Sequence, residues 1–230
     1  MHYVYISVLT ILLRGWTFAS GSMVVASCIV TDEAKFNRDG VNNTHNSHVW
    51  GDENPHATVE SNFQQRFSVN VWCAVLDDQL IGPFILEGRL TGKTYLRFLQ
   101  EELPQLLKDV PLDKWSRLYF QHDGAPPHSS RGVTNFLNYR FPGQWIGRCG
   151  PHHWPASSPD LSPLDYCVWG WMKELVYNVK MATRDALLGR ILDAADHINN
   201  KLKLLRATHA VHNWAAACVA AGGGIFENQL

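Results

Sequence analysis

The sequence predicts a mixed α/β fold, in which three antiparallel strands are followed by alternating helices and strands. Up to residue 88 the apolar segments are short, rich in β-branched residues and separated by polar stretches, as expected for strands. From residue 96 onwards, apolar residues recur at helical spacing, interrupted by two more strand-like segments. This order of elements is typical of a sheet that is covered by helices.

Length and composition allow a large core. The chain has 230 residues, of which 46% are hydrophobic, and this excludes intrinsic disorder as a description of the whole chain. Its 20 lysines and arginines against 21 aspartates and glutamates give a net charge of −1, which excludes a strongly basic nucleic-acid-binding domain.

Three strands are expected in the first part of the chain. Residues 26–32 form a short apolar run that ends in acidic residues. Residues 68–76 (SVNVWCAVL) are nearly all apolar, which predicts a buried strand. Residues 82–88 form another short strand between glycines, and the polar stretch before residue 68 is expected to be a loop with an edge strand near residues 48–50.

Helices and strands are then expected to alternate. Leucines at helical spacing predict a helix over residues 96–110, with a kink at Pro104. A strand at 118–123 stops at an Asp-Gly turn, a short helix surrounds residues 133–137, and a last strand covers residues 144–148. A proline-rich loop leads from there to helices at 163–179 and 187–205, the second of which is the clearest amphipathic helix of the chain.

Three aspartates are the candidate functional residues. Asp32 and Asp123 each end a predicted strand, where side chains leave the core and face a ligand crevice. Asp165 falls in the first turn of a helix that Ser162 and Pro163 introduce. A count of 100° per residue places Asp165 on the apolar face of this helix, where a buried carboxylate needs a partner. The same count places Glu174 on the solvent-exposed face.

Each aspartate also has an ordinary structural interpretation. Asp123 could simply start the Asp-Gly turn, and Asp165 could close a capping box with Ser162. Asp32 could be a charged strand end. Spacing and periodicity alone do not show that the three side chains converge.

Cysteine and histidine suggest a second metal hypothesis. Five cysteines are scattered without a C-x-x-C pair, which disfavours a disulfide framework and favours a reducing compartment. The group Cys149, His152, His153 and Cys167 could in principle bind zinc. It lacks two close ligand pairs, so buried thiols and loop histidines are the alternative.

Three segments of the chain resemble the signature blocks of mariner-superfamily transposases: 31–36 (TDEAKF), 121–128 (QHDGAPPH) and 154–166 (WPASSPDLSPLDY). Connecting segments at 66–72, 89–92 and 222–227 are similar too, so the resemblance covers about residues 27–230. It implies a ribonuclease-H-like catalytic domain that cuts and rejoins DNA, with catalytic carboxylates matching Asp32, Asp123 and Asp165. Asp160, in the third block, is interpreted as a loop or cap residue.

The resemblance also implies a metal. Three close carboxylates repel one another unless cations neutralise them, and oxygen ligands select Mg²⁺ or Mn²⁺ over zinc. Two such ions would support phosphodiester cleavage and strand transfer by the three aspartates. His122 and His128 flank the site and would contact its ligands or DNA phosphates, with packing as the alternative; Arg131 and Trp154 are further nucleic-acid candidates.

The resemblance finally predicts the domain organisation and the partners. Residues 27–230 would be the catalytic domain, and residues 1–26 a leader or truncated remnant too short for the helix-turn-helix region that reads transposon ends. The expected partners are transposon-end and target DNA and a second copy of the chain, in the nucleus and without a membrane. One alternative is a catalytically silent, transposon-derived nucleic-acid-binding domain. Another is secretion, if the apolar stretch 3–13 is a signal peptide, which would make the Asn42 sequon meaningful.

Overall fold

The structure is a computed structural model, and it describes residues 27–38, 40, 67–154, 162–179 and 181–199. Within these residues, six strands form one sheet in the order β3-β2-β1-β4-β5-β6. Some sequence predictions concern residues outside the described ones, namely the leader at 1–26, Asn42, the edge strand near 48–50, Asp160, the last helix beyond residue 199 and the segment 222–227.

The first half of the sheet is antiparallel, as predicted. β1 (Ser27–Asn37) pairs with β2 (Ser68–Leu76), and β2 pairs with β3 (Gln79–Leu86). Residues 71–76 of β2 are all buried. The nearly continuous apolar sequence of this strand therefore reflects helices on both of its faces.

β1 is longer than its sequence predicted. The acidic pair Asp32 and Glu33 was expected to end the strand, but β1 continues to Asn37 and both acids lie inside it. Alternation explains the extension, because Ala34 and Phe36 are buried while Lys35 and Asn37 are exposed. The prediction that Asp32 ends a strand is therefore wrong.

The second half of the sheet is parallel. β4 (Leu118–Gln121) lies parallel to β1, β5 (Trp145–Gly147) parallel to β4, and the two-residue β6 (His152–His153) parallel to β5. The predicted mixed sheet is confirmed. β6 was not predicted, because a strand of two residues leaves no pattern in the sequence.

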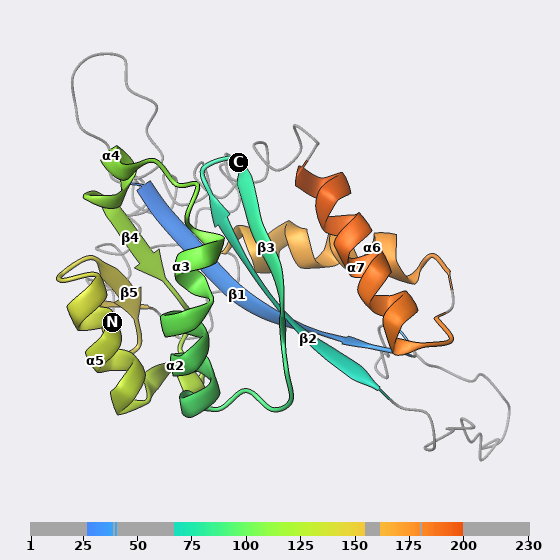
Figure 1. The fold of residues 1–230 in the computed structure, drawn as a ribbon, viewed down its shortest axis with the longest axis horizontal. Coiled ribbons are helices and arrows are strands. Elements are labelled where there is room, and N and C mark those ends of the chain that lie inside the picture. The colour runs from blue at the N-terminus through green and yellow to red at the C-terminus, as the bar shows by residue number, and fades with distance from the viewer. Residues whose placement is uncertain (1–26, 39, 41–66, 155–161, 180, 200–230) are drawn as a thin grey trace, which may run out of the picture.

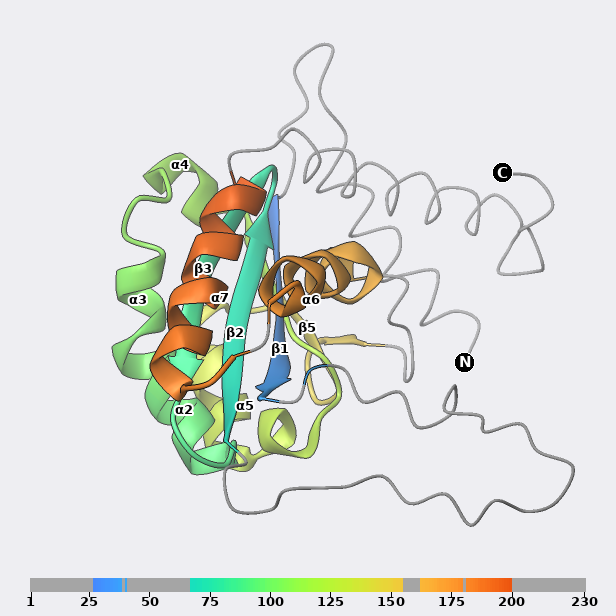
Figure 2. The same ribbon diagram turned by 90° about the vertical axis from the view of Figure 1, so that its right-hand side faces the viewer.

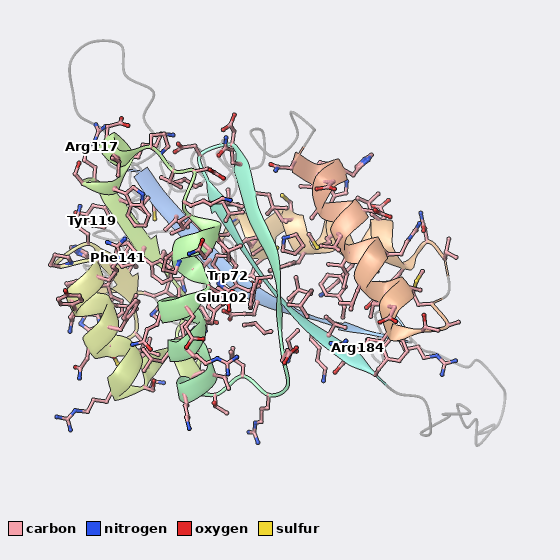
Figure 3. The ribbon with its side chains drawn as sticks, viewed as in Figure 1. Trp72, Glu102, Arg117, Tyr119, Phe141 and Arg184 are labelled. Atoms are coloured by element: carbon pink, nitrogen blue, oxygen red, sulfur yellow. The ribbon has the colours of Figure 1, made fainter. Side chains whose placement is uncertain are left out.

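One face of the sheet is covered by the helices of the middle of the chain. These are α2 (Gly92–Glu101), α3 (Leu103–Leu106) and α5 (Arg131–Arg140), with the short α4 (Leu112–Trp115) before β4 (Figure 1). The predicted kink at Pro104 is a break between α2 and α3. The core on this face includes Trp72 and Phe141, both labelled in Figure 3.

The other face is covered by the last two described helices. A π-helical turn (Leu164–Val168) leads into α6 (Trp169–Tyr177), and α7 (Arg184–Asn199) packs against α6 and β3. In Figure 2 the sheet is viewed nearly edge-on, with α2 and α3 on one side and α6 on the other. This core includes Phe36, Cys73 and Met172.

The four cysteines among the described residues are free thiols. Cys28 and Cys73 are buried free thiols, and burial raises the pKa of Cys28 to about 12. Cys149 is exposed and Cys167 is partly buried, both as free thiols.

No helix in the described part of the chain combines the length and apolarity needed to cross a membrane.

Gly147 leaves room for a neighbouring side chain. It is the last residue of β5 and is buried. A Cβ atom at Gly147 would overlap the imidazole of His122, whereas a Cβ at Gly189 in α7 would meet nothing. The absence of a side chain at residue 147 therefore leaves the space that the His122 ring occupies.

We expect Gly147→Ala to lower the free energy of unfolding by about 1–3 kcal/mol, because an added methyl group must displace a packed ring. Gly189→Ala is the matched control and should stabilise the protein by about 0.5–1 kcal/mol, because alanine favours a helix interior. Denaturant unfolding of both variants checks this. Equal effects of the two substitutions would contradict the packing described here.

Candidate active site

The pairing of β1 with β4 brings two of the three aspartates to the same height. Val30 of β1 pairs with Gln121 of β4, and Asp32 and Asp123 each lie two residues further along. The Thr31 hydroxyl donates a hydrogen bond to the Gln121 carbonyl (2.8 Å), which fixes the two strands where β4 ends. Asp32, within β1, and Asp123, in the loop that follows β4, therefore lie at the same height, as expected for a crevice beyond the carboxyl end of β4.

Alternation along β1 sends the two neighbouring acids to opposite faces. Asp32 faces α6, where the Trp169 indole N–H donates a 2.6 Å hydrogen bond to its Oδ2. Glu33 faces the side of α2 and of the 3₁₀ turn Pro126–Ser129, where its Oε2 lies 3.2 Å from Nε2 of His128.

Asp165 lies on the π-helical turn that precedes α6. Its side chain is exposed, and its backbone N–H donates to the Ser162 hydroxyl at 3.4 Å. The predicted burial of Asp165 is wrong, because a π-helix holds more residues per turn than the 100° count assumes. Leu164, Val168 and Trp169 take the buried positions instead. The Ser162 hydroxyl contact of the alternative capping interpretation is present.

Asp32 and Asp165 repel each other. The pKa of Asp32 is raised to about 8, first by burial and next by the negative charge of Asp165, although the Trp169 hydrogen bond opposes the shift. A buried carboxylate beside a second carboxylate is stable in its ionised form only when a cation is nearby. The donor chemistry of this pair, with oxygen atoms only, fits Mg²⁺ or Mn²⁺.

Asp123 is held by its own loop. Its Oδ1 accepts hydrogen bonds from the Ala125 N–H (2.9 Å) and from Nδ1 of His128 (2.6 Å). Burial opposes ionisation, but these hydrogen bonds together lower the pKa of Asp123 below its ordinary value. Asp123 thus bonds within its own loop, and its side chain is still 45% exposed.

The two histidines of the second block have different surroundings. The His122 ring is buried among Tyr95, Phe120 and Trp145, and burial lowers its pKa to about 3, which favours the packing interpretation. Burial would also lower the pKa of His128, but the hydrogen bond with Asp123 and the close carboxylate of Glu33 raise it to about 10. His128 therefore contacts a predicted ligand.

The remaining predicted residues are Arg131 and Trp154. Arg131 is exposed at the first turn of α5. Trp154 is half-buried after β6 and packs against Cys28, Val30 and Ile146. A nucleic-acid contact of Arg131 or Trp154 stays a prediction.

The zinc hypothesis finds no support in the geometry. His152 Nε2 contacts the Gly143 carbonyl, and His153 Nδ1 contacts the Arg148 carbonyl. Across the residues that the structure describes, no three His, Cys, Asp or Glu side chains lie close enough to hold one metal ion. This holds for Asp32, Asp123 and Asp165 as well, and Oδ1 of Asp123 contacts His128 instead.

Sequence reasoning missed three residues of the site, Glu33, Tyr95 and Trp169. Trp169 lies on the apolar face of the helix predicted at 163–179, and its indole N–H gives no periodic signal. Tyr95, on α2, is buried, and burial together with the charges of Glu33, Asp123 and Asp32 raises its pKa. Glu33 adjoins Asp32, and strand alternation was the available signal that it faces the other side.

Sequence comparisons point to one family. The family model described as DDE superfamily endonuclease matches residues 27–188. The transposable element Tc3 transposase of Caenorhabditis elegans is 28% identical over 200 residues, which cover 84% of this chain and 56% of that protein. The chain therefore spans little more than half the length of this curated relative.

Solved structures of Mos1 transposase share the fold. The Mos1 catalytic domain with raltegravir and Mn matches with a TM-score of 0.65 at 19% identity, covering 98% of this chain and 96% of that chain. The catalytic domain of Mos1 mariner transposase gives 0.64 at 18%, covering 98% and 93%. A Mos1 paired-end complex with the left transposon end gives 0.63 at 21%, covering 98% and 63%. The ribonuclease-H-like arrangement is thus confirmed.

We expect Asp32→Asn to stabilise the metal-free protein by about 1–3 kcal/mol near pH 8, because it removes a buried charge that faces Asp165. The pKa of Asp32 in the folded state, about 8, lies above its value in an unfolded chain. Ionisation of Asp32 therefore costs stability as the pH rises from about 4 to about 8, and the advantage of the Asp32→Asn variant grows over that range.

Thermal unfolding in the presence of a chelator, at a series of pH values, measures this effect. The control is Asp193→Asn, which neutralises an exposed aspartate of α7. An Asp32→Asn variant that is less stable than the wild type at pH 8, or whose advantage does not change with pH, would contradict the electrostatic description of the site.

Proposed function

Because the chain belongs to the DDE superfamily endonuclease family, we propose that it cleaves phosphodiester bonds of DNA and transfers the cut strands. Asp32, Asp123 and Asp165 are the proposed metal ligands and catalytic residues. The observation that carries the proposal is the repulsion between Asp32 and Asp165, beside Asp123 at the same height of the sheet. A protein keeps such a costly arrangement where function requires it.

The carboxylates would hold two Mg²⁺ or Mn²⁺ ions. When bound, such ions activate a water or a 3′-hydroxyl and stabilise the leaving oxygen of an in-line displacement. The role of this chain's other residues is to orient the metal ligands. Trp169 holds Asp32 through its indole N–H, and the Ala125 N–H holds Asp123 from its own loop. Asp165 is exposed on its turn, which gives its carboxylate room to reorient toward the other two.

DNA is the proposed partner. Asp165 is exposed and Asp123 is nearly half exposed, so the carboxylates are open to a large substrate. The Mos1 structure with the left transposon end is a paired-end complex, and by analogy we propose transposon-end and target DNA as substrates and a second copy of this chain as partner. A chain acting on chromosomal DNA would work in the nucleus, and this localisation is part of the proposal.

A catalytically silent nucleic-acid-binding domain is the second candidate function. One observation favours it: the described residues do not gather three ligands around one point, and His128 contacts Oδ1 of Asp123. The two candidates differ in whether metal ions draw the carboxylates together. They make opposite predictions for cleavage.

We expect the 230-residue chain to nick supercoiled plasmid DNA in the presence of Mn²⁺ and to lose this activity when a chelator is added. Asp123→Asn, Asp165→Asn and Asp32→Asn should each reduce nicking by at least about a hundredfold, because each removes a charged ligand. Asp193→Asn should leave nicking unchanged. Gel electrophoresis of the plasmid forms gives the rates.

Binding of a labelled duplex to the same proteins separates the two functions. Metal-dependent nicking that the three aspartate variants lose supports the endonuclease. Duplex binding without nicking, unaffected by Asp165→Asn, supports the silent domain and contradicts the proposed function.

A further inference from the structure

Glu33 is a fourth carboxylate of the site, outside the three-aspartate set. It follows Asp32 directly and faces the opposite side of β1. Its side chain is only 14% exposed, and its Oε1 is buried without a hydrogen-bond partner among the described residues. A buried carboxylate costs free energy unless a partner compensates it, so its presence at this position requires an explanation.

The partner of Glu33 is the imidazole of His128. Nε2 of this ring lies 3.2 Å from Oε2 of Glu33, and Nδ1 lies 2.6 Å from Oδ1 of Asp123. The ring therefore spans the space between two carboxylates from different segments, one in β1 and one after β4. Through it, the position of Glu33 is connected to the position of Asp123.

The ring has little freedom to move. The His128 side chain is 1% exposed, the His122 ring stacks on it at 4.8 Å with an interplanar angle of 9°, and the Tyr95 ring lies 4.3 Å away. The 3₁₀ turn that carries His128 packs against α2, where Gly92 leaves room for Ser130. A buried ring packed against two neighbouring rings transmits a constraint from one nitrogen to the other.

We propose that Glu33 is a positioning residue that acts through His128 to fix the carboxylate of Asp123. The inference rests on the proposed function, in which Asp123 is a metal ligand. Glu33 itself touches neither DNA nor metal in this account. A contact that orients a ligand from behind typically changes metal affinity by about 10–100-fold when it is lost.

The orientation matters because Asp123 has two hydrogen bonds on the same oxygen. The Ala125 N–H and His128 Nδ1 both bind Oδ1, which sets the rotation of the carboxylate. When Glu33 no longer anchors the far side of the ring, His128 can shift and Asp123 can rotate with it. A chain with a displaced Asp123 should still bind DNA, because the DNA-facing surface is unchanged.

The test uses Glu33→Gln and Glu33→Asp in the full chain. Glu33→Gln keeps the size of the side chain and removes its charge, and Glu33→Asp keeps the charge and shortens the reach. Glu174→Gln, on the exposed face of α6, is the matched control. Three quantities are measured: Mn²⁺ affinity by electron paramagnetic resonance without DNA, kcat and KM for plasmid nicking, and the His128 ring signals by nuclear magnetic resonance.

We expect Glu33→Gln to weaken Mn²⁺ binding by about tenfold or more and to lower kcat by a similar factor, with KM for DNA changed less than about twofold. The His128 ring signals should move in both Glu33 variants, and Glu33→Asp should have the smaller effect on Mn²⁺ affinity. Glu174→Gln should match the wild type in every measurement. If Glu33→Gln does not fold, Glu33→Asp and the ring signals carry the test.

Two results would overturn the inference in distinguishable ways. If the wild type binds Mn²⁺ and nicks DNA but the Glu33 variants equal it in Mn²⁺ affinity and kcat, Glu33 does not position Asp123 and the proposed function stands. If the wild type neither binds Mn²⁺ nor nicks DNA, the proposed function fails and the inference fails with it.

Discussion

The parallel pairing of β1 with β4 is the constraint on which the site depends. Four residue pairs, from Ser27 with Leu118 to Val30 with Gln121, set the height at which β4 ends beside a strand that continues. Asp32 and Asp123 occupy equivalent heights only in this register, because sliding β4 by one residue would place Asp123 beside a different residue of β1 and turn every side chain of β4 to the other face. Burial of the apolar residues of both strands makes such a shift costly, so the core of the domain holds the carboxylates in place.

β1 divides the site between the two layers of helices. Asp32 meets Trp169 and Asp165 on the side of α6, whereas Glu33 meets His128 on the side of α2. The two groups differ in electrostatics. The α6 side holds two carboxylates that repel each other, and the α2 side holds two carboxylates with an imidazole between them. The first group needs a cation for both carboxylates to be ionised, whereas the imidazole of His128 can supply positive charge to the second.

The sequence predicted the sheet and most of the helices because their apolar residues follow clear periods. β2 matches its predicted range, and the antiparallel and parallel halves are in the predicted order. Prediction failed where a local conformation departs from the usual period. The π-helical turn exposes Asp165, and the continued alternation of Ala34 and Phe36 carries β1 past its acids. Contacts such as His128 with Glu33 join residues far apart in sequence, and only the register of the sheet brings them together. The near-zero net charge was a poor guide to function, because the placement of the acids decides what they bind.

The central claim is that segments around Asp32, Asp123 and Asp165 meet at one metal site. Replacing Mg²⁺ with Fe²⁺ and adding peroxide and ascorbate cuts the backbone next to the bound ion, and mass spectrometry locates the breaks. We expect breaks near residues 32, 123 and 165 together, and we expect excess Mg²⁺ to suppress them. Breaks confined to one of these segments, or clustered instead at His152 and His153, would contradict it.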